Sequence, residues 1–170
     1  MGGSVVHMEQ VEVIFTRSRS GAEALEEVIS GARVSIVAAL YRLANPRLVA
    51  ALGAARQRGV SIRLSLNFND HYEENRAAQA ALRERSIPFR LLGGRKGTHS
   101  KMHHKFAVID GRVVAMGSYN WTMESEQGNY ENLVLLGSPL VAAAYSEEFE
   151  ALWKEGWTPE PAPPAGGTHA

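Results

Sequence analysis

The sequence predicts an α/β fold with a mixed, largely parallel central sheet flanked by helices on both faces. Three observations predict it. Strand-like and helix-like segments alternate through the first half of the chain, a pattern that favours parallel strands joined by helices. Residues 34–40 form a continuous apolar run, which is typical of a strand covered on both faces. The pair Asp110-Gly111 separates two further apolar runs and predicts a tight hairpin, because both turn positions favour positive φ.

The individual elements follow from apolar runs and capping residues. Apolar, often β-branched runs predict strands at residues 11–15, 34–40, 62–66, 104–109, 113–116 and 131–136. Residues that cap or begin a helix precede each helical pattern: Ser20 with Glu23, Asn45 with Pro46, Asp70 with Glu73, and Ser138 with Pro139. Gly59 ends the second of these helices, and the third must end before Pro88.

The chain has 170 residues, about the size of one domain. We expect a folded domain over residues 11–157, an N-terminal tail over 1–10, and a disordered tail over 158–170, where four of the seven prolines fall. The absence of cysteine excludes disulfides, zinc knuckles, iron–sulfur clusters and thiol nucleophiles. Apolar runs all fall short of the roughly 18 residues that a membrane span requires.

The opening residues, MGGSVVHMEQ, lack the basic and apolar regions of a secretory signal. We therefore favour a cytoplasmic location. If His7-Met8 was left by cloning, a native signal could have been removed, and a periplasmic or secreted location stays open.

The net charge of zero conceals an uneven distribution. Residues 1–123 carry 17 Lys and Arg against 10 Asp and Glu, whereas residues 124–170 carry one Lys against eight acids. Between Ile87 and Ile109 the charged side chains are all basic, namely Arg90, Arg95, Lys96, Lys101 and Lys105, and three histidines accompany them. Such a cationic stretch suits an anionic ligand.

The residues that carry chemistry lie on the hairpin and the strand after it. On a strand, His103 and Lys105 project to the same face, while His104 points away. An imidazole beside an ammonium can attack a phosphate or transfer protons while the lysine offsets charge on its oxygens. Ser118 and Asn120 share a face and would add neutral donors, and Glu131 could accept a proton from the far nitrogen of His103.

Simpler roles compete with these. Asp110 is more readily a turn former than a catalytic acid, and Trp121 and the other aromatic residues are interpreted as core rather than as platforms for stacked bases. His99 and His103 have the spacing of a helical metal pair, but Gly97 and the predicted strand speak against a helix there. We therefore expect no metal, and no cofactor.

Taken together, His103-x-Lys105-x₄-Asp110-x₆-Gly117-Ser118-x-Asn120 resembles the HKD signature of the phospholipase D superfamily. The Gly-Ser-x-Asn-Trp-Thr run and Glu131 resemble the corresponding residues of the single-motif nuclease branch of this superfamily. That branch comprises bacterial Nuc-type endonucleases and mitochondrial cardiolipin hydrolase/Zucchini. The resemblance covers about residues 11–155, so residues 11–157 would be a phospholipase D-like catalytic domain.

The resemblance implies a role for each matching residue. His103 would attack phosphorus and form a phosphohistidine, Lys105 and Asn120 would bind the phosphate with Ser118 close behind, and Glu131 would orient His103. Asp110 matches the aspartate of the motif, which supports the site structurally. Because only one motif is present, the second histidine would come from another copy of the chain, which implies a homodimer and requires no metal.

These residues favour a metal-independent phosphodiesterase that cleaves DNA or RNA with little sequence preference, with Arg90, Arg95, Lys96 and Lys101 as candidates for binding the nucleic-acid backbone. One alternative is a hydrolase of phospholipids such as cardiolipin. No basic amphipathic helix of the interfacial kind is evident, so we do not expect a membrane partner. A third hypothesis is a nucleic-acid-binding module without catalysis.

Overall fold

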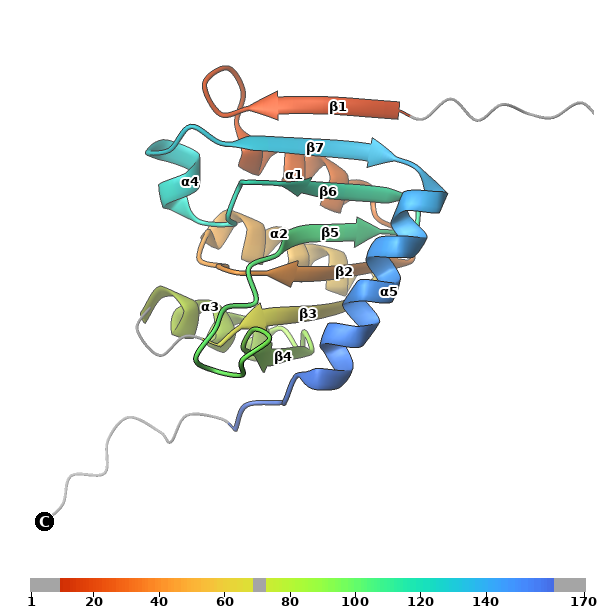
Figure 1. Ribbon diagram of the computed structural model, residues 1–170. Helices are drawn as coiled ribbons and strands as arrows, with labels where there is room; N and C mark the ends of the chain where they lie inside the picture. The colour runs from red at the N-terminus through yellow and green to blue at the C-terminus, as the bar shows by residue number, and fades with distance from the viewer. Residues whose placement is uncertain (1–9, 69–72, 161–170) are drawn as a thin grey trace, which may run out of the picture.

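The computed structural model describes residues 10–68 and 73–160 (Figure 1). The strands are β1 (Gln10–Phe15), β2 (Ser35–Leu40), β3 (Ser61–Asn67), β4 (Phe89–Leu92), β5 (Lys105–Ile109), β6 (Val113–Gly117) and β7 (Asn132–Gly137). The helices are α1 (Gly21–Gly31), α2 (Pro46–Gln57), α3 (Glu73–Glu84), α4 (Met123–Gln127) and α5 (Pro139–Glu155).

The seven strands form one mixed sheet in the order β1-β7-β6-β5-β2-β3-β4. The predicted α/β class with a mixed sheet is confirmed, but the expectation of a largely parallel sheet is wrong. Only β2, β3 and β4 pair in parallel, and the remaining neighbours are antiparallel. The reason is that helical crossovers through α2 and α3 give only two parallel pairs, β2 with β3 and β3 with β4. The β5–β6 hairpin and β7 then insert between β1 and β2, which would otherwise form the first parallel pair.

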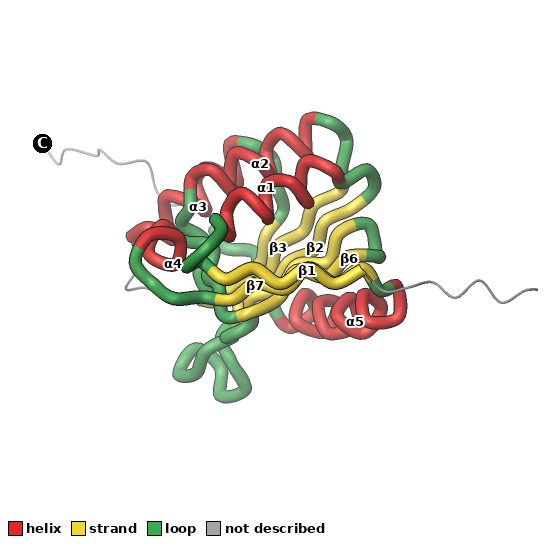
Figure 2. Tube along the Cα trace, turned by 90° about the horizontal axis from the view of Figure 1, so that it is seen from above, coloured by secondary structure: helices red, strands yellow, loops and turns green. Residues whose placement is uncertain are grey.

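Helices cover both faces of the sheet, as expected. Figure 2 shows α1, α2 and α3 on one face and α5 alone on the other. Alternate side chains of β5 point to opposite faces of the sheet. Ala107 and Ile109 pack in the core under α1–α3. Phe106 and Val108 pack in the core under α5. The apolar strands at the centre of the sheet are therefore buried on both faces.

The predicted helix starts are confirmed where the structure describes them. The side chains of Ser20, Asn45 and Ser138 each accept a backbone N–H of the helix that follows. Gly59, with φ +90°, follows the end of α2. The cap expected at Asp70 lies outside the described residues, as do residues 1–9 and 161–170 of the expected tails.

The aromatic residues divide into two groups. Tyr119, Trp121 and Phe149 are at most 1% exposed and belong to the core, as expected. Tyr130 and Phe15 do not follow that expectation, because they are 83% and 57% exposed. Phe15 ends β1 and Tyr130 shortly precedes β7, at the edge of the sheet away from α5, which packs on β2 to β6.

Asp110 ties the β5–β6 hairpin to the start of β2. Asp110 and Gly111 have φ values of +53° and +62°, which confirms the predicted turn. The Asp110 carboxylate accepts the backbone N–H groups of Arg33, Val34 and Ser35 at 2.8–2.9 Å. Burial alone would raise the pKa of Asp110, but these hydrogen bonds outweigh it and hold the pKa below its ordinary value.

We predict that Asp110→Asn lowers the free energy of unfolding by about 1–3 kcal/mol at neutral pH, because one acceptor oxygen becomes an amide that faces backbone N–H groups. Asparagine tolerates positive φ, so the turn itself is retained. The folded-state pKa is depressed, so the carboxylate contributes stability above the ordinary aspartate pKa of 3.8, and this contribution is lost as the pH falls through the lower folded-state value. Urea unfolding of both proteins at a series of pH values measures this difference in free energy. Equal stability of wild type and Asp110→Asn at neutral pH would contradict the prediction.

Candidate active site

The candidate residues gather at one edge of the sheet because of strand direction. β5 and β7 run antiparallel to β6, which lies between them. The N-terminal ends of β5 and β7 therefore lie beside the C-terminal end of β6 (Figure 1). His103 and Lys105 stand at the start of β5, Ser118 and Asn120 follow β6, and Glu131 directly precedes β7.

His103 and Lys105 are in direct contact, as the strand parity predicts. Lys105 Nζ lies 3.2 Å from His103 Nδ1 and 3.4 Å from Nε2, and it donates to the His103 carbonyl oxygen at 2.9 Å. The imidazole also packs on Tyr41, with ring centroids 4.3 Å apart. Lys105 Nζ lies 5.2 Å from the same tyrosine ring, which favours a cation above its face.

The surroundings of His103 favour its neutral form. Partial burial lowers the pKa of His103, and the positive charges of Lys105 and Lys101 lower it further. Burial also lowers the pKa of Lys105, although the charge of Glu131 opposes this shift. The lowered pKa favours an unprotonated imidazole, which can act as a nucleophile or base, and the Lys105 amine beside it can, when protonated, neutralise phosphate oxygens.

Asn67 and Tyr41 hold the backbone around His103, and the sequence interpretation assigned neither a role there. Asn67, at the end of β3, is 3% exposed, and its Oδ1 accepts the N–H of Met102 at 2.9 Å. The Tyr41 N–H donates to the His104 carbonyl at 2.7 Å. The nucleophile candidate is thus fixed on both sides by the ends of β2 and β3. The sequence signal that could have identified Asn67 is an asparagine directly after the strand-like run of residues 62–66.

Glu131 organises the loop beside the site and makes none of its described hydrogen bonds with His103. Its carboxylate accepts from the hydroxyls of Ser118 and Ser125 and, at 3.3 Å, from the Asn129 amide. Ser118 Oγ in turn accepts the Asn132 N–H at 3.1 Å. The geometry of this chain therefore connects Glu131 to Ser118 directly and to Lys105 through its charge, whereas the expected proton acceptance from His103 stays a prediction.

The segment after β6 alternates between core and site. Tyr119 and Trp121 are buried, so Ser118 and Asn120 face the site edge, as the two-residue spacing predicts. The Oδ1 atom of Asn120 is buried and has no hydrogen-bond partner among the described residues. Gly117 allows the close approach of β7, because a Cβ there would lie 2.2 Å from the Asn132 carbonyl oxygen.

Two candidates lie elsewhere. Asp110 is at the opposite end of β5 from His103, where its carboxylate fastens the hairpin to the backbone at the start of β2. Arg90 is also occupied, because its Nη1 donates to the Trp153 carbonyl at 2.6 Å and its guanidinium lies 4.7 Å from the Trp153 ring. The local charge pattern could not show that α5 would cover this arginine.

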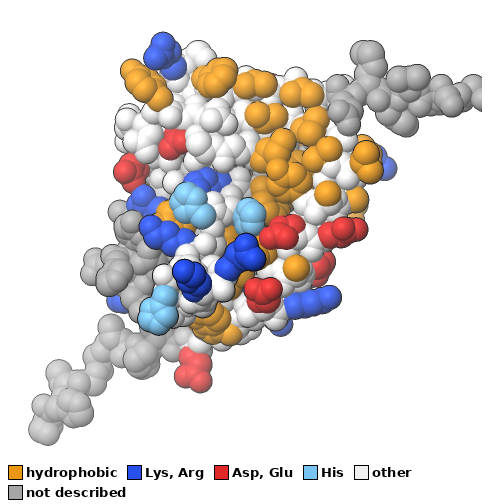
Figure 3. All heavy atoms as spheres, in the orientation of Figure 1, with side chains coloured by type: hydrophobic (Ala, Val, Ile, Leu, Met, Phe, Trp, Pro, Cys, Tyr) orange, Lys and Arg blue, Asp and Glu red, His pale blue; other side chains and the backbone are white. Residues whose placement is uncertain are grey.

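The other basic candidates stay accessible. Arg95, Lys96 and Lys101 are exposed on the loop between β4 and β5. Lys101 Nζ lies 5.6 Å from the Tyr41 ring, beside the candidate active site. Figure 3 shows histidine and basic side chains gathered on this part of the surface. His104 points to the opposite side from Lys105, as predicted, and contacts Glu148 of α5 at 3.2 Å.

Within residues 10–68 and 73–160, no three His, Asp or Glu side chains lie together in a way that could hold a metal ion. In the same residues, every helix is too short or too polar to cross a membrane.

Comparison with known proteins identifies relatives along most of the chain. Mitochondrial cardiolipin hydrolase of Xenopus laevis is 32% identical over 148 residues, which cover 87% of this chain and 68% of that protein. The human protein of the same name is 32% identical over 136 residues, covering 80% of this chain and 52% of that protein.

Solved structures agree with this relationship. Nuc from Salmonella typhimurium, a phospholipase D family member, matches with a TM-score of 0.82 and 26% identity over 88% of this chain and 97% of that chain. NucT from Helicobacter pylori has the same fold, with a TM-score of 0.76 and 19% identity over 88% of this chain and 98% of that chain. The family described as "Cardiolipin synthase, PLD-like domain" matches residues 25–153. With the His103–Lys105 pair and its fold in place, this chain belongs to the PLD-like family of phosphodiesterases.

Proposed function

We propose that this chain is a metal-independent endonuclease of low sequence specificity, which cleaves DNA or RNA at a site shared between two copies of the chain. The contact of a neutral His103 imidazole with the Lys105 ammonium carries the proposal. It pairs a nucleophile with charge neutralisation at an accessible sheet edge, without requiring a metal.

The chemistry proceeds in two displacements. An imidazole nitrogen of His103 attacks phosphorus, a P–N bond forms, and the bond from phosphorus to the leaving oxygen breaks. A second, protonated imidazole gives its proton to that oxygen. The same imidazole then removes a proton from water, whose oxygen attacks phosphorus and breaks the P–N bond. His103 is regenerated, and the second imidazole is again protonated.

The second imidazole is the reason for proposing a dimer. Among the described histidines, His104 contacts Glu148 on the α5 side, and His99 stands on the exposed loop. Neither is paired with a lysine as His103 is. His103 of the partner subunit would complete the site if a two-fold axis passed beside this edge of the sheet, which gives one composite site per dimer.

The neighbouring polar groups fit supporting roles. Lys105 would neutralise the phosphate oxygens, and the amide of Asn120 would donate to one of them. Ser118 lies beside them and is oriented by its hydrogen bond to Glu131. Glu131 also keeps a negative charge near Lys105, which supports its protonated form.

The exposed basic loop favours nucleic acid as substrate. Arg95, Lys96 and Lys101 could contact backbone phosphates regardless of base sequence. A second candidate function is hydrolysis of cardiolipin, because several relatives carry the name mitochondrial cardiolipin hydrolase. The phosphodiester chemistry is common to both substrates, so a direct comparison of substrates distinguishes them.

We predict that His103→Asn reduces cleavage at least 100-fold, because it removes the nucleophile with little change of volume. Cleavage of single-stranded DNA, RNA and cardiolipin liposomes should be compared in excess EDTA. His104→Asn is the matched control and should retain activity, since that side chain points to α5.

Nucleic-acid cleavage that resists EDTA and disappears in His103→Asn supports the proposal. Turnover of liposomes alone would establish the lipid substrate. Cleavage abolished by EDTA would contradict the mechanism, and binding without cleavage by the wild-type protein would support a non-catalytic module.

A shared site makes a second prediction about mixed dimers. When wild-type and His103→Asn chains are co-refolded at several ratios, only dimers with two intact histidines should turn over. Activity per total chain should then follow the square of the wild-type fraction. A linear dependence would mean that each chain is active by itself.

The basic loop makes a prediction about salt. Arg95→Gln with Lys96→Gln should raise KM and reduce the slope of log(kcat/KM) against log salt concentration by about 1–2, because each lost phosphate contact releases about one counterion fewer. Arg33→Gln with Arg56→Gln changes the net charge equally at exposed sites away from the loop, and should leave the slope unchanged. Equal slopes in both double variants would exclude the loop from the binding surface.

A further inference from the structure

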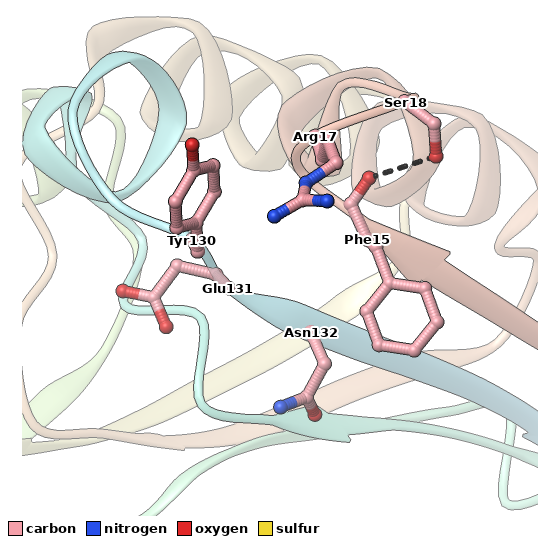
Figure 4. A pocket seen from close by; sticks show the side chains of 6 residues that line it. All are labelled: Phe15, Arg17, Ser18, Tyr130, Glu131 and Asn132. Atoms are coloured by element: carbon pink, nitrogen blue, oxygen red, sulfur yellow. Dashed lines mark hydrogen bonds between the residues drawn. The ribbon is translucent and has the colours of Figure 1, made fainter.

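A pocket of about 510 Å³ opens directly beside the candidate active site (Figure 4). Its lining comes from the end of β1 with the turn that follows, and from the first residue of β7 with the two residues before it. The lining residues are Phe15, Arg17, Ser18, Tyr130, Glu131 and Asn132. Glu131 and Asn132 also hydrogen-bond to Ser118, so two lining residues of the pocket contact the candidate phosphate site.

The pocket presents two aromatic rings to solvent. Tyr130 is 83% exposed and Phe15 is 57% exposed, whereas the nearby Tyr119 and Trp121 are buried. The guanidinium of Arg17 lies 4.9 Å from the centre of the Tyr130 ring. Exposed rings beside a cation form a surface on which planar, electron-rich groups can stack.

The charges of the pocket suit a neutral ligand better than a phosphate. Arg17 and Glu131 contribute one charge of each sign, and Ser18 and Asn132 contribute a hydroxyl and an amide. A nucleobase offers a flat face to the rings and polar edges to these groups. The Glu131 carboxylate would repel a phosphate in the pocket, whereas the Lys105 ammonium at the neighbouring site would attract it.

The distance between the two sites also fits. Phe106 lies opposite Met116, and Met116 opposite Val134, so β5 and β7 are two strand spacings apart. Two spacings correspond to about 10 Å. A base attached near the phosphate at Lys105 could therefore reach the pocket at the start of β7.

We propose that Phe15, Arg17 and Tyr130 form a nucleobase subsite, which stacks an unpaired base beside the phosphodiester that is cleaved. The inference rests on the proposed nuclease function and makes the preferred substrate single-stranded. Bases within a duplex are already stacked and paired, and they cannot present a free face to these rings.

Tyr130→Leu and Tyr130→Phe test the subsite, because only the second keeps the aromatic ring. The substrate is a short oligothymidylate, and the control substrate is an abasic oligomer of the same length and backbone. With oligothymidylate, Tyr130→Leu should raise KM about 5- to 100-fold, as expected for loss of one stacked base. Tyr130→Phe should behave as wild type, kcat should change little, and cleavage of the abasic oligomer should be the same in all three proteins.

Three outcomes with a wild-type protein that cleaves oligothymidylate would overturn the subsite. An unchanged KM in Tyr130→Leu, or an equal loss with the abasic oligomer, would mean that no base stacks there. A change of oligomeric state in sedimentation would assign the rings to a contact between chains. Loss of binding to cardiolipin vesicles, with oligothymidylate cleavage intact, would assign them to a lipid surface. Failure of the wild-type protein to cleave either oligomer would instead refute the nuclease function itself.

Discussion

The alignment of the β5–β6 hairpin is the constraint on which the site depends. Its turn has positive φ at Asp110 and Gly111, and the Asp110 carboxylate fastens it to the backbone before β2. A slip of one residue would turn every side chain of a strand to the opposite face. His103 and Lys105 would then lose their position, so an aspartate far from the phosphate site determines which groups meet there.

At the end of the hairpin opposite its turn, this alignment brings the polar side chains of the candidate site together at one edge of the sheet. Three strand ends meet there, and each contributes side chains that a packed core would exclude. Partial burial and the nearby charges of Lys105 and Lys101 lower the pKa of His103, which favours the unprotonated imidazole. Asn67 and Tyr41 hold the backbone on either side of His103. The site is therefore preorganised by backbone contacts that extend across the sheet.

Local signals in the sequence predicted the helix caps, the hairpin and the pairing of His103 with Lys105, because these depend on neighbours along the chain. The strand order was less accessible, since the insertion of β5, β6 and β7 beside β2 depends on pairing between distant segments. The same limit explains Arg90, whose partner Trp153 lies 63 residues away. Exposure of Tyr130 and Phe15 likewise follows from where α5 packs, which composition does not reveal.

The covalent intermediate at His103 is the central claim, and rapid quenching tests it most directly. Labelled oligonucleotide would be mixed with the protein, quenched in base, and the modified peptide sequenced by mass spectrometry. The account predicts a phosphoramidate on His103, at no more than one per two chains, which is absent in His103→Asn and retained in His104→Asn. A label on His104, or steady turnover with no label on any histidine, would contradict the account.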